Sequence, residues 1–402
     1  MNNSSLRTNL QRQSTFISQK VDCLPPSGIR KFFDLLSTMK DVISLGIGEP
    51  DFVTPWHIRE AATYSLEKGY TMYTSNFGMF ELRQELASYM ELHYGVSYHP
   101  EHEILITVGS SEGLDLSMRA IINPGDEVII PNPCYVAYPA NITLAGGVPI
   151  AILTTEENNF VIKATDIEAR ITKRTKAILL GYPSNPTGAV MPRSEASAIA
   201  RLAEKHNLLV ISDEIYARLV YGTEHICFAS LPGMKERTIL INGLSKSHAM
   251  TGWRIDYVAA SYELIQALTK IHQYTMLCAP IMAQIAAIEA LKNGESELEK
   301  MVQEYDRRRR LMLKRLNAIG LTCFEPKGAF YAFPAIKITG MTSEEFAEKL
   351  LIEEKVAVVP GTAFGQCGEG FVRCCYATSL DNIEEALRRI ERFVRKNKTS
   401  TA

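Results

Sequence analysis

The chain has 402 residues, of which 46% are hydrophobic and 22% charged, and its formal net charge is −2. This composition is typical of a soluble globular protein of two lobes or domains, and it lacks the basic footprint of a nucleic-acid-binding protein. No segment reaches the ~18 apolar residues that a membrane span needs. We therefore expect neither nucleic acid nor a membrane among its partners.

The cysteines and the N-terminus bear on the cellular compartment. Eight cysteines are scattered along the chain without C-x-x-C spacing, so we expect no metal site and no disulfide framework, and a reducing cytoplasm fits best. Residues 1–20 contain Arg7 and Arg12, no acidic residue and no apolar signal core. They are interpreted as a frayed tail, with an organelle-transit segment as the alternative.

From about residue 55 to 290, predicted strands and helices alternate. The apolar runs 177–180 and 208–212 are typical of strands that are covered on both faces. The predicted fold is therefore α/β, with a three-layer, mostly parallel sheet. The other strands are expected at 103–108, 126–130 and 238–242, and the helices at 112–122 and 193–206.

The C-terminal third has a different pattern. It begins with a long charged helix at 295–319 and predicts a smaller α+β lobe that packs with the N-terminal arm. We expect a large domain at 55–290 and a discontinuous small domain made of 1–54 plus 291–402. Strands are predicted at 328–333 and 371–376, and helices at 343–354 and 383–395.

One segment, 245–254, places Lys246 among small and hydroxyl residues and Arg254 eight positions later. A neutral lysine amine can form a Schiff base with a carbonyl, and a guanidinium can bind a phosphate through two hydrogen bonds. The pair indicates pyridoxal phosphate, a phosphorylated carbonyl cofactor. Two solvated surface charges are the alternative for this pair taken alone.

Further candidates follow predicted strands, where α/β sheets bind ligands. Residues 109–111 precede a helix, so they can bind a phosphate or serve as an ordinary N-cap. Asp213 could pair a pyridine nitrogen, with Tyr216 and Asn185 at the ring oxygen. Tyr135 is either a stacking face for the ring or a core aromatic.

These motifs, in this order, resemble the class I/II aminotransferases of the fold-type-I pyridoxal-phosphate enzymes. The resemblance covers about residues 24–395. It rests on Leu45–Phe52, Tyr182–Gly188, Ser212–Tyr216, Ser245–Arg254 and Val372–Arg373.

The resemblance implies a role for each position. Lys246 would form the Schiff base and move the substrate's α-proton, and Arg373 would bind the α-carboxylate with Asn185 and the backbone of Gly48. Tyr73 would reach the phosphate of a neighbouring subunit, so a homodimer with shared sites is implied. The cofactor-binding set is Tyr73, Ser110, Ser111, Glu112, Tyr135, Asn185, Asp213, Tyr216, Ser245, Lys246 and Arg254, and Tyr135 would also contact substrate.

Three positions depart from patterns within the family. Many relatives have a hydroxyl where this chain has Gly243, so we expect one phosphate contact to be missing. Aspartate-specialised relatives often have a lysine at Ser111 and a tryptophan at Tyr135. The motifs at 46–50, 327–331 and 361–365 are closer to those of aromatic or broad-range members. The resemblance therefore favours an aromatic or broad-range aminotransferase, which passes the amino group from an L-amino acid to a 2-oxo acid, expected to be 2-oxoglutarate, by a ping-pong mechanism. The alternatives are an aspartate-specific enzyme, a pyridoxal-phosphate carbon–sulfur β-lyase and a cofactor-sensing regulator.

Overall fold

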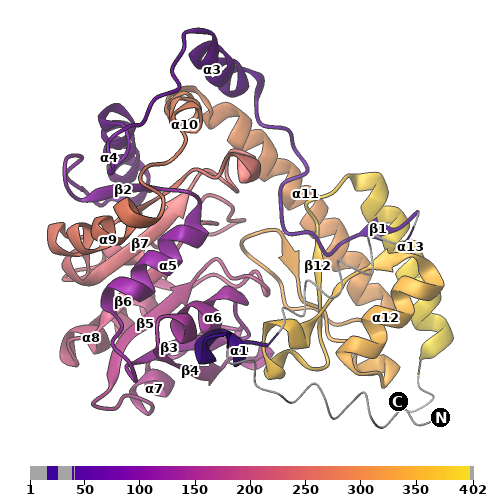
Figure 1. The fold of residues 1–402 in the computed structure, drawn as a ribbon. Helices are drawn as coiled ribbons and strands as arrows, with labels where there is room; N and C mark the ends of the chain where they lie inside the picture. The colour runs from indigo at the N-terminus through magenta and orange to yellow at the C-terminus, as the bar shows by residue number, and fades with distance from the viewer. Residues whose placement is uncertain (1–15, 26–38, 40, 399–402) are drawn as a thin grey trace.

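The computed structural model describes residues 16–25, 39 and 41–398 (Figure 1). Its centre is a seven-stranded sheet of order β2-β8-β7-β6-β5-β3-β4. β8 runs antiparallel to both of its neighbours, and the other pairs are parallel. The strands are β2 Ile104–Thr107, β3 Glu127–Asn132, β4 Val148–Leu153, β5 Thr175–Gly181, β6 Leu209–Asp213, β7 Thr238–Gly243 and β8 Asp256–Ala259.

Helices cover both faces of this sheet. In β5, Ile178 and Leu180 pack in one core cluster with α8 (Arg193–Lys205), whereas Ala177 and Leu179 pack in another with α5 (Ser110–Ile121). Successive side chains of a strand point to opposite faces, so both sets can be apolar only if both faces are buried. The expected three-layer α/β fold is confirmed. α6 Ala137–Leu144, α7 Ala164–Glu168 and α9 Tyr262–Thr275 complete these layers.

The C-terminal residues form a second group of elements, reached through α11 (Glu295–Ile319) on the right of Figure 1. An antiparallel sheet of order β11-β12-β9 lies there, and β1 (Ile43–Ser44) pairs in parallel with β10 (Val356–Ala357). The N-terminal arm is thus hydrogen-bonded to the C-terminal lobe. The other elements are β9 Tyr331–Ala332, β11 Val359–Pro360, β12 Val372–Cys375, α12 Ser343–Glu354 and α13 Leu380–Asn397.

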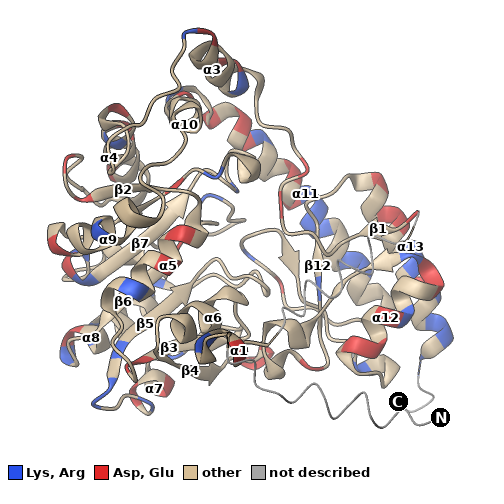
Figure 2. Ribbon diagram, in the orientation of Figure 1, with Lys and Arg blue, Asp and Glu red and all other residues tan. Residues whose placement is uncertain are grey.

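A helical region extends above the sheet in Figure 1, where α3 lies beside α10. Lysine, arginine, aspartate and glutamate are intermixed over the helices visible in Figure 2, with no face of one sign. Among the described residues, no helix has the length and apolarity to cross a bilayer. The remaining helices are α1 Gln19–Asp22, α3 Trp56–Glu67, α4 Phe80–Tyr94 and α10 Ile281–Asn293, and short 3₁₀ turns such as Thr251–Trp253 and Gly361–Phe364 occur in loops.

The structure differs from the predicted strands in several places. The strand expected at 328–333 is reduced to Tyr331–Ala332, because the Ala329 N–H bonds instead to the carbonyl of Leu219. The two-residue strands β1, β10 and β11 were missed, and so were two strands of the central sheet. β4 lies at the sheet edge with most of its residues incompletely buried, and β8 has four residues and begins with the charged Asp256. β8 carries a residue of the cavity described next.

Candidate active site

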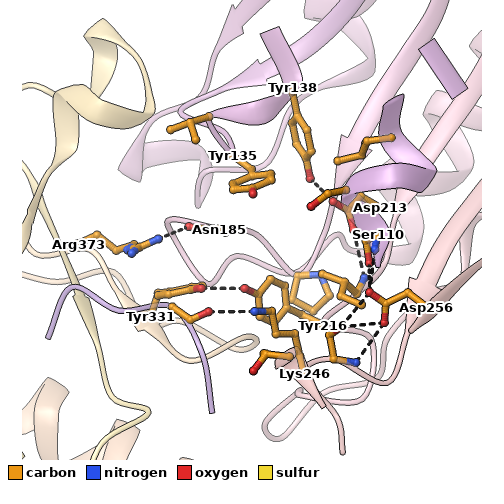
Figure 3. Close-up of a pocket in the computed structure, with 18 of the residues that line it drawn as sticks. Ser110, Tyr135, Tyr138, Asn185, Asp213, Tyr216, Lys246, Asp256, Tyr331 and Arg373 are labelled. Carbon is orange, nitrogen blue, oxygen red and sulfur yellow. Dashed lines mark hydrogen bonds between the residues drawn. The ribbon is translucent and has the colours of Figure 1, made fainter. Parts of the chain in front are cut away.

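A cavity of about 400 Å³ lies at the carboxyl ends of β6 and β7, between the sheet and the C-terminal lobe. Parallel α/β sheets bind ligands at this edge. Figure 3 shows Arg373 on one side of the cavity and Ser110 and Asp256 on the other. Eleven residues predicted from the sequence line it: Gly48, Ser110, Ser111, Tyr135, Asn185, Asp213, Tyr216, Ser245, Lys246, Arg254 and Arg373.

Lys246 projects into the middle of the cavity from the loop after β7. Its Nζ donates a hydrogen bond to the carbonyl oxygen of Gly48 at 3.0 Å. Burial lowers the pKa of Lys246, while the charge of Asp256 raises it by a smaller amount. Burial disfavours the charged form of an amine, so the environment favours the neutral amine that nucleophilic attack requires.

Asp213, the last residue of β6, is 7% exposed. Its Oδ2 accepts a hydrogen bond from the Tyr138 hydroxyl at 2.8 Å, and its Oδ1 accepts one from the Ile215 N–H at 3.3 Å. Burial raises the pKa of Asp213 to about 6, although the Tyr138 hydrogen bond lowers it. The group is a buried carboxylate that a cationic ligand atom would stabilise in its ionised form. We call this part of the cavity the Asp213 end.

Arg373 is held from several sides. Nη1 donates to Oδ1 of Asn185 at 2.8 Å and Nη2 to the carbonyl of Gly46 at 2.6 Å. The guanidinium carbon lies 4.5 Å from the ring centre of Tyr331 and 4.8 Å from that of Phe364. Such stacking fixes the plane of the guanidinium.

The Nε of Arg373 is buried and makes no hydrogen bond within the described structure. A buried donor without a partner is costly. The side chain is thus positioned with hydrogen-bonding capacity still free, which suits an anionic ligand such as a carboxylate.

Figure 3 shows Tyr216 and Tyr331 next to Lys246, and the hydroxyls of the two tyrosines are 2.7 Å apart. Tyr331 also lies against Gly48, where an added Cβ would overlap its hydroxyl. Gly48 is therefore needed for the close approach of the N-terminal arm to the site.

Ser110 lies across the cavity from Arg373 in Figure 3 and meets Ser245 at Asp256, and we call this part of the cavity the Ser110 end. Both their N–H groups and both their hydroxyls donate to the carboxylate of Asp256, at 2.7 and 2.9 Å from Ser110 and at 2.8 to 3.1 Å from Ser245. Arg254 lies beside them, close enough to Gly109 that a Cβ there would overlap its guanidinium. This end combines a helix N-terminus, hydroxyls and a cation, which together bind anions.

Two predicted site residues do not line the cavity. Tyr73 is 82% exposed. The Glu112 carboxylate is turned away, because it accepts hydrogen bonds from the Val108 N–H and lies 2.6 Å from Nδ1 of His272. Tyr135 does line the cavity, with its ring edge-on to Tyr138 at 5.7 Å between ring centres.

The sequence reasoning missed three residues of this site: Tyr138, Asp256 and Tyr331. Asp256 interrupts the apolar run 255–260, and a lone carboxylate in such a run is costly unless it has partners. The argument that singled out Asp213 therefore applies to Asp256 too. Tyr138 carries no comparable signal, since its partner Asp213 is 75 residues away.

Known proteins similar to this chain point in one direction. Residues 40–390 match the family described as aminotransferase class I and II. The chain is 55% identical to a putative aminotransferase, YugH, of Bacillus subtilis, over 95% of this chain and 99% of that one. It is 46% identical to an aspartate aminotransferase of Pyrococcus abyssi, over 95% of this chain and 99% of the relative.

A solved structure agrees with these relatives. The aromatic aminotransferase of Pyrococcus horikoshii is similar with a TM-score of 0.87 at 44% identity, over 91% of this chain and 99% of that one. The resemblance inferred from the sequence motifs is confirmed. This chain belongs to the class I and II aminotransferases, enzymes whose cofactor is pyridoxal phosphate.

Proposed function

We propose that this aminotransferase accepts aromatic or a broad range of L-amino acids as donors and passes the amino group to 2-oxoglutarate. One observation carries the proposal: Arg373 faces the cavity with unused hydrogen-bonding capacity, between the aromatic rings of Tyr331 and Phe364. A stacked guanidinium suits an α-carboxylate. Aromatic surface beside it suits an apolar side chain.

The side chains of the Asp213 end fit the ring of the cofactor. Asp213 would face the pyridine nitrogen, and Tyr216 and Asn185 the ring oxygen. When bound, pyridoxal phosphate supplies a ring that accepts the electrons left when a substrate C–H bond is broken. An ionised Asp213 would keep the ring nitrogen protonated, which supports that role.

Lys246 would carry the covalent attachment and the proton transfer. Burial favours its neutral amine, so Nζ can attack a carbonyl carbon and, once released, take a proton from the substrate α-carbon. The Gly48 carbonyl, 3.0 Å from Nζ, orients the amine within the cavity. Arg373 and Asn185 would hold the substrate carboxylate at a fixed distance from Nζ.

At the Ser110 end, the donors are those that a phosphate needs. Ser110, Ser111, Ser245 and Arg254 would bind it at the N-terminus of α5. The fit at this end is incomplete, because Ser110 and Ser245 already donate to Asp256.

We also propose a homodimer in which Tyr73 contributes to the site of the partner subunit. Tyr73 is 82% and Met72 73% exposed, and Tyr274 is 86% exposed. The two segments are neighbours, since Asn76 donates a hydrogen bond to the carbonyl of Leu277 at 2.7 Å. Large exposed apolar side chains gathered in one region are typical of an interface.

The division into a large domain at 55–290 and a small domain of 1–54 plus 291–402 stays a proposal, as does a cytoplasmic location. Pairing of β1 with β10 supports the former. The eight cysteines are free thiols, which supports the latter. Most of the segment interpreted as a tail or a transit peptide lies outside the described residues.

An aspartate-specific enzyme is the second candidate. A distal carboxylate needs a cation of its own. The lysines and arginines that line the described cavity are Lys246, Arg254 and Arg373, and each already has a proposed partner. Because 2-oxoglutarate also has a distal carboxylate, this count does not separate the two donor classes, and the aromatic rings beside Arg373 carry the preference for the aromatic or broad-range donor.

The test uses purified protein with added pyridoxal phosphate, 2-oxoglutarate and a panel of donors: aspartate, alanine, tyrosine, phenylalanine and an acylated diaminopimelate. We expect the largest kcat/KM with an aromatic donor. A preference for aspartate by more than about tenfold would reject the proposed donor class. Release of pyruvate and ammonia from cystathionine without any 2-oxo acid would support a β-lyase instead.

A further inference from the structure

A second buried carboxylate lies in the cavity, at the Ser110 end. Asp256 is 4% exposed and is the first residue of β8, where it pairs with Thr107 of β2 and Gly243 of β7. Its two oxygens accept hydrogen bonds from both the N–H and the hydroxyl of Ser110 and Ser245. Figure 3 shows these bonds converging on one carboxylate.

These are the donors that the cofactor phosphate would require. A backbone N–H or a serine hydroxyl has one hydrogen to donate, so a hydrogen given to Asp256 is withheld from a phosphate oxygen. The N-terminus of α5 favours one anion at this place, and Asp256 already supplies it. Ser111 and Arg254 then remain as the donors that line this end without donating to Asp256.

We propose that the Asp256 carboxylate takes the place of the cofactor phosphate in the cofactor-free protein, and that it thereby sets the affinity for pyridoxal phosphate and the pH dependence of that affinity. The inference rests on the cofactor of the family and not on the proposed amino donor.

The charges around Asp256 determine the sign of the pH dependence. A phosphate dianion beside an ionised carboxylate is repelled, and the repulsion is strong where water is excluded. The other lysine, arginine and aspartate side chains that line the described cavity are Lys246, whose pKa burial lowers, Asp213, Arg254 and Arg373, while Glu112 of α5 is directed to His272. Burial raises the pKa of Asp256, although the bonds from Ser245 and Ser110 lower it.

Once protonated, Asp256 carries no charge and can donate a hydrogen bond to a phosphate oxygen. Binding of the phosphate is then coupled to uptake of a proton. Affinity for the phosphorylated cofactor should therefore fall as pH rises, by up to about tenfold per pH unit where Asp256 is ionised in the free protein.

Gly243 belongs to the same arrangement. It stands opposite Asp256 in the β7–β8 register, and a Cβ on Gly243 would overlap the Asp256 carboxylate. A hydroxyl side chain at position 243, which many relatives have, is therefore excluded by Asp256. The absence of a phosphate-binding hydroxyl at position 243 therefore has a steric cause, which is the Asp256 carboxylate.

The experiment measures equilibrium binding of two probes, pyridoxal phosphate and pyridoxal, to cofactor-free full-length protein between pH 6 and 9. The ratio of the two dissociation constants isolates the phosphate, because ring and lysine titrations affect both probes. In the wild type we expect this phosphate preference to be small and to fall as pH rises. Asp256→Asn removes the charge and keeps the volume, so it should raise the preference at least about tenfold at high pH and flatten its pH dependence.

Asp256→Gly frees the four donors and should raise the preference at least as much. Inorganic phosphate should also raise the melting temperature of this variant more than that of the wild type. Asp213→Asn is the matched control, since it removes the other buried carboxylate of the cavity, which accepts no hydrogen bond from Ser110 or Ser245, and it should change the phosphate preference far less than either Asp256 variant.

The proposal is overturned if neither variant binds pyridoxal phosphate more tightly than the wild type, or if the wild-type preference rises with pH. The pH series on the wild type alone decides this should a variant fail to fold. None of these measurements uses an amino donor, so a wrong donor class would leave them unaffected.

Discussion

The cavity holds two buried carboxylates, Asp213 and Asp256, and the two groups are prepared for opposite ligands. Asp213 accepts hydrogen bonds from one phenol hydroxyl and one backbone N–H, and it would contact a ring nitrogen that can be cationic. Asp256 is surrounded by donors and would meet a phosphate. Burial raises both pKa values. An ionised aspartate therefore strengthens binding of a cationic ring nitrogen at Asp213 and weakens binding of an anionic phosphate at Asp256.

The largest effect is expected at Lys246. Lys246→Ala removes the only group proposed both to attack the carbonyl and to move the α-proton. Transamination should fall by at least about 10⁴-fold, while the protein stays folded and still binds cofactor. Lys300→Ala, on the exposed face of α11, is the control and should leave turnover unchanged. Near-normal turnover in Lys246→Ala would end the assignment.

Substitution of Arg373 tests whether this side chain binds the carboxylate of the substrate. Arg373→Ala should lower kcat/KM for both the amino donor and 2-oxoglutarate by roughly 10²–10³-fold, because a charge-assisted pair in a desolvated site is lost. Arg373→Lys keeps the charge without the planar fork and should give an intermediate loss. An unchanged kcat/KM for both substrates would place the carboxylate site elsewhere.

The raised pKa of Asp213 predicts how the free energy of unfolding of the cofactor-free protein depends on pH. Its pKa is raised from 3.8 to about 6 by burial, so between these values the folded state binds more protons than the unfolded state. The free energy of unfolding should therefore fall as pH rises through this window, by about 3 kcal/mol in total from this group.

The measurement compares denaturant unfolding of the wild type and Asp213→Asn at pH 4 to 7. The variant lacks this contribution, so the difference between the two proteins isolates it. His248, whose pKa burial lowers to about 4, contributes the opposite slope to both proteins and cancels. A difference that does not change with pH would contradict the raised pKa of Asp213.

The smallest effect is expected for Tyr138→Phe, which removes a hydrogen bond to Asp213 and leaves both carboxylates in place. The hydroxyl of Tyr138 lowers the pKa of Asp213, so its loss should raise that pKa further and disfavour the ionised form. Cofactor affinity should weaken roughly two- to tenfold, equally for pyridoxal phosphate and pyridoxal. Tyr135→Phe leaves this hydrogen bond intact and is the matched control for loss of a phenol.

Local sequence patterns predicted much of the fold. The run 177–180 lies within β5 and the run 208–212 overlaps β6 from residue 209, because a strand buried on both faces is continuously apolar. The helix expected at 295–319 has those bounds in the structure, since its first turn is acidic and Gly320 adopts the left-handed conformation that ends a helix. The incompletely buried edge strand β4 and the short strand β8 were not predicted, whereas β2, a fully buried run of four residues at the other edge, was.

Sequence by itself identified the groups that we propose to carry the chemistry: Lys246 in its loop, Asp213 at a strand end and Arg373 in a C-terminal strand. Each sits in a short motif that can be recognised without its neighbours in space. Only the tertiary structure decided that Ser110 and Ser245 donate to Asp256, because these three residues come from α5, a loop and β8. Their contact depends on how β8 pairs with β7, and strand register across a sheet is set by packing that no local pattern contains.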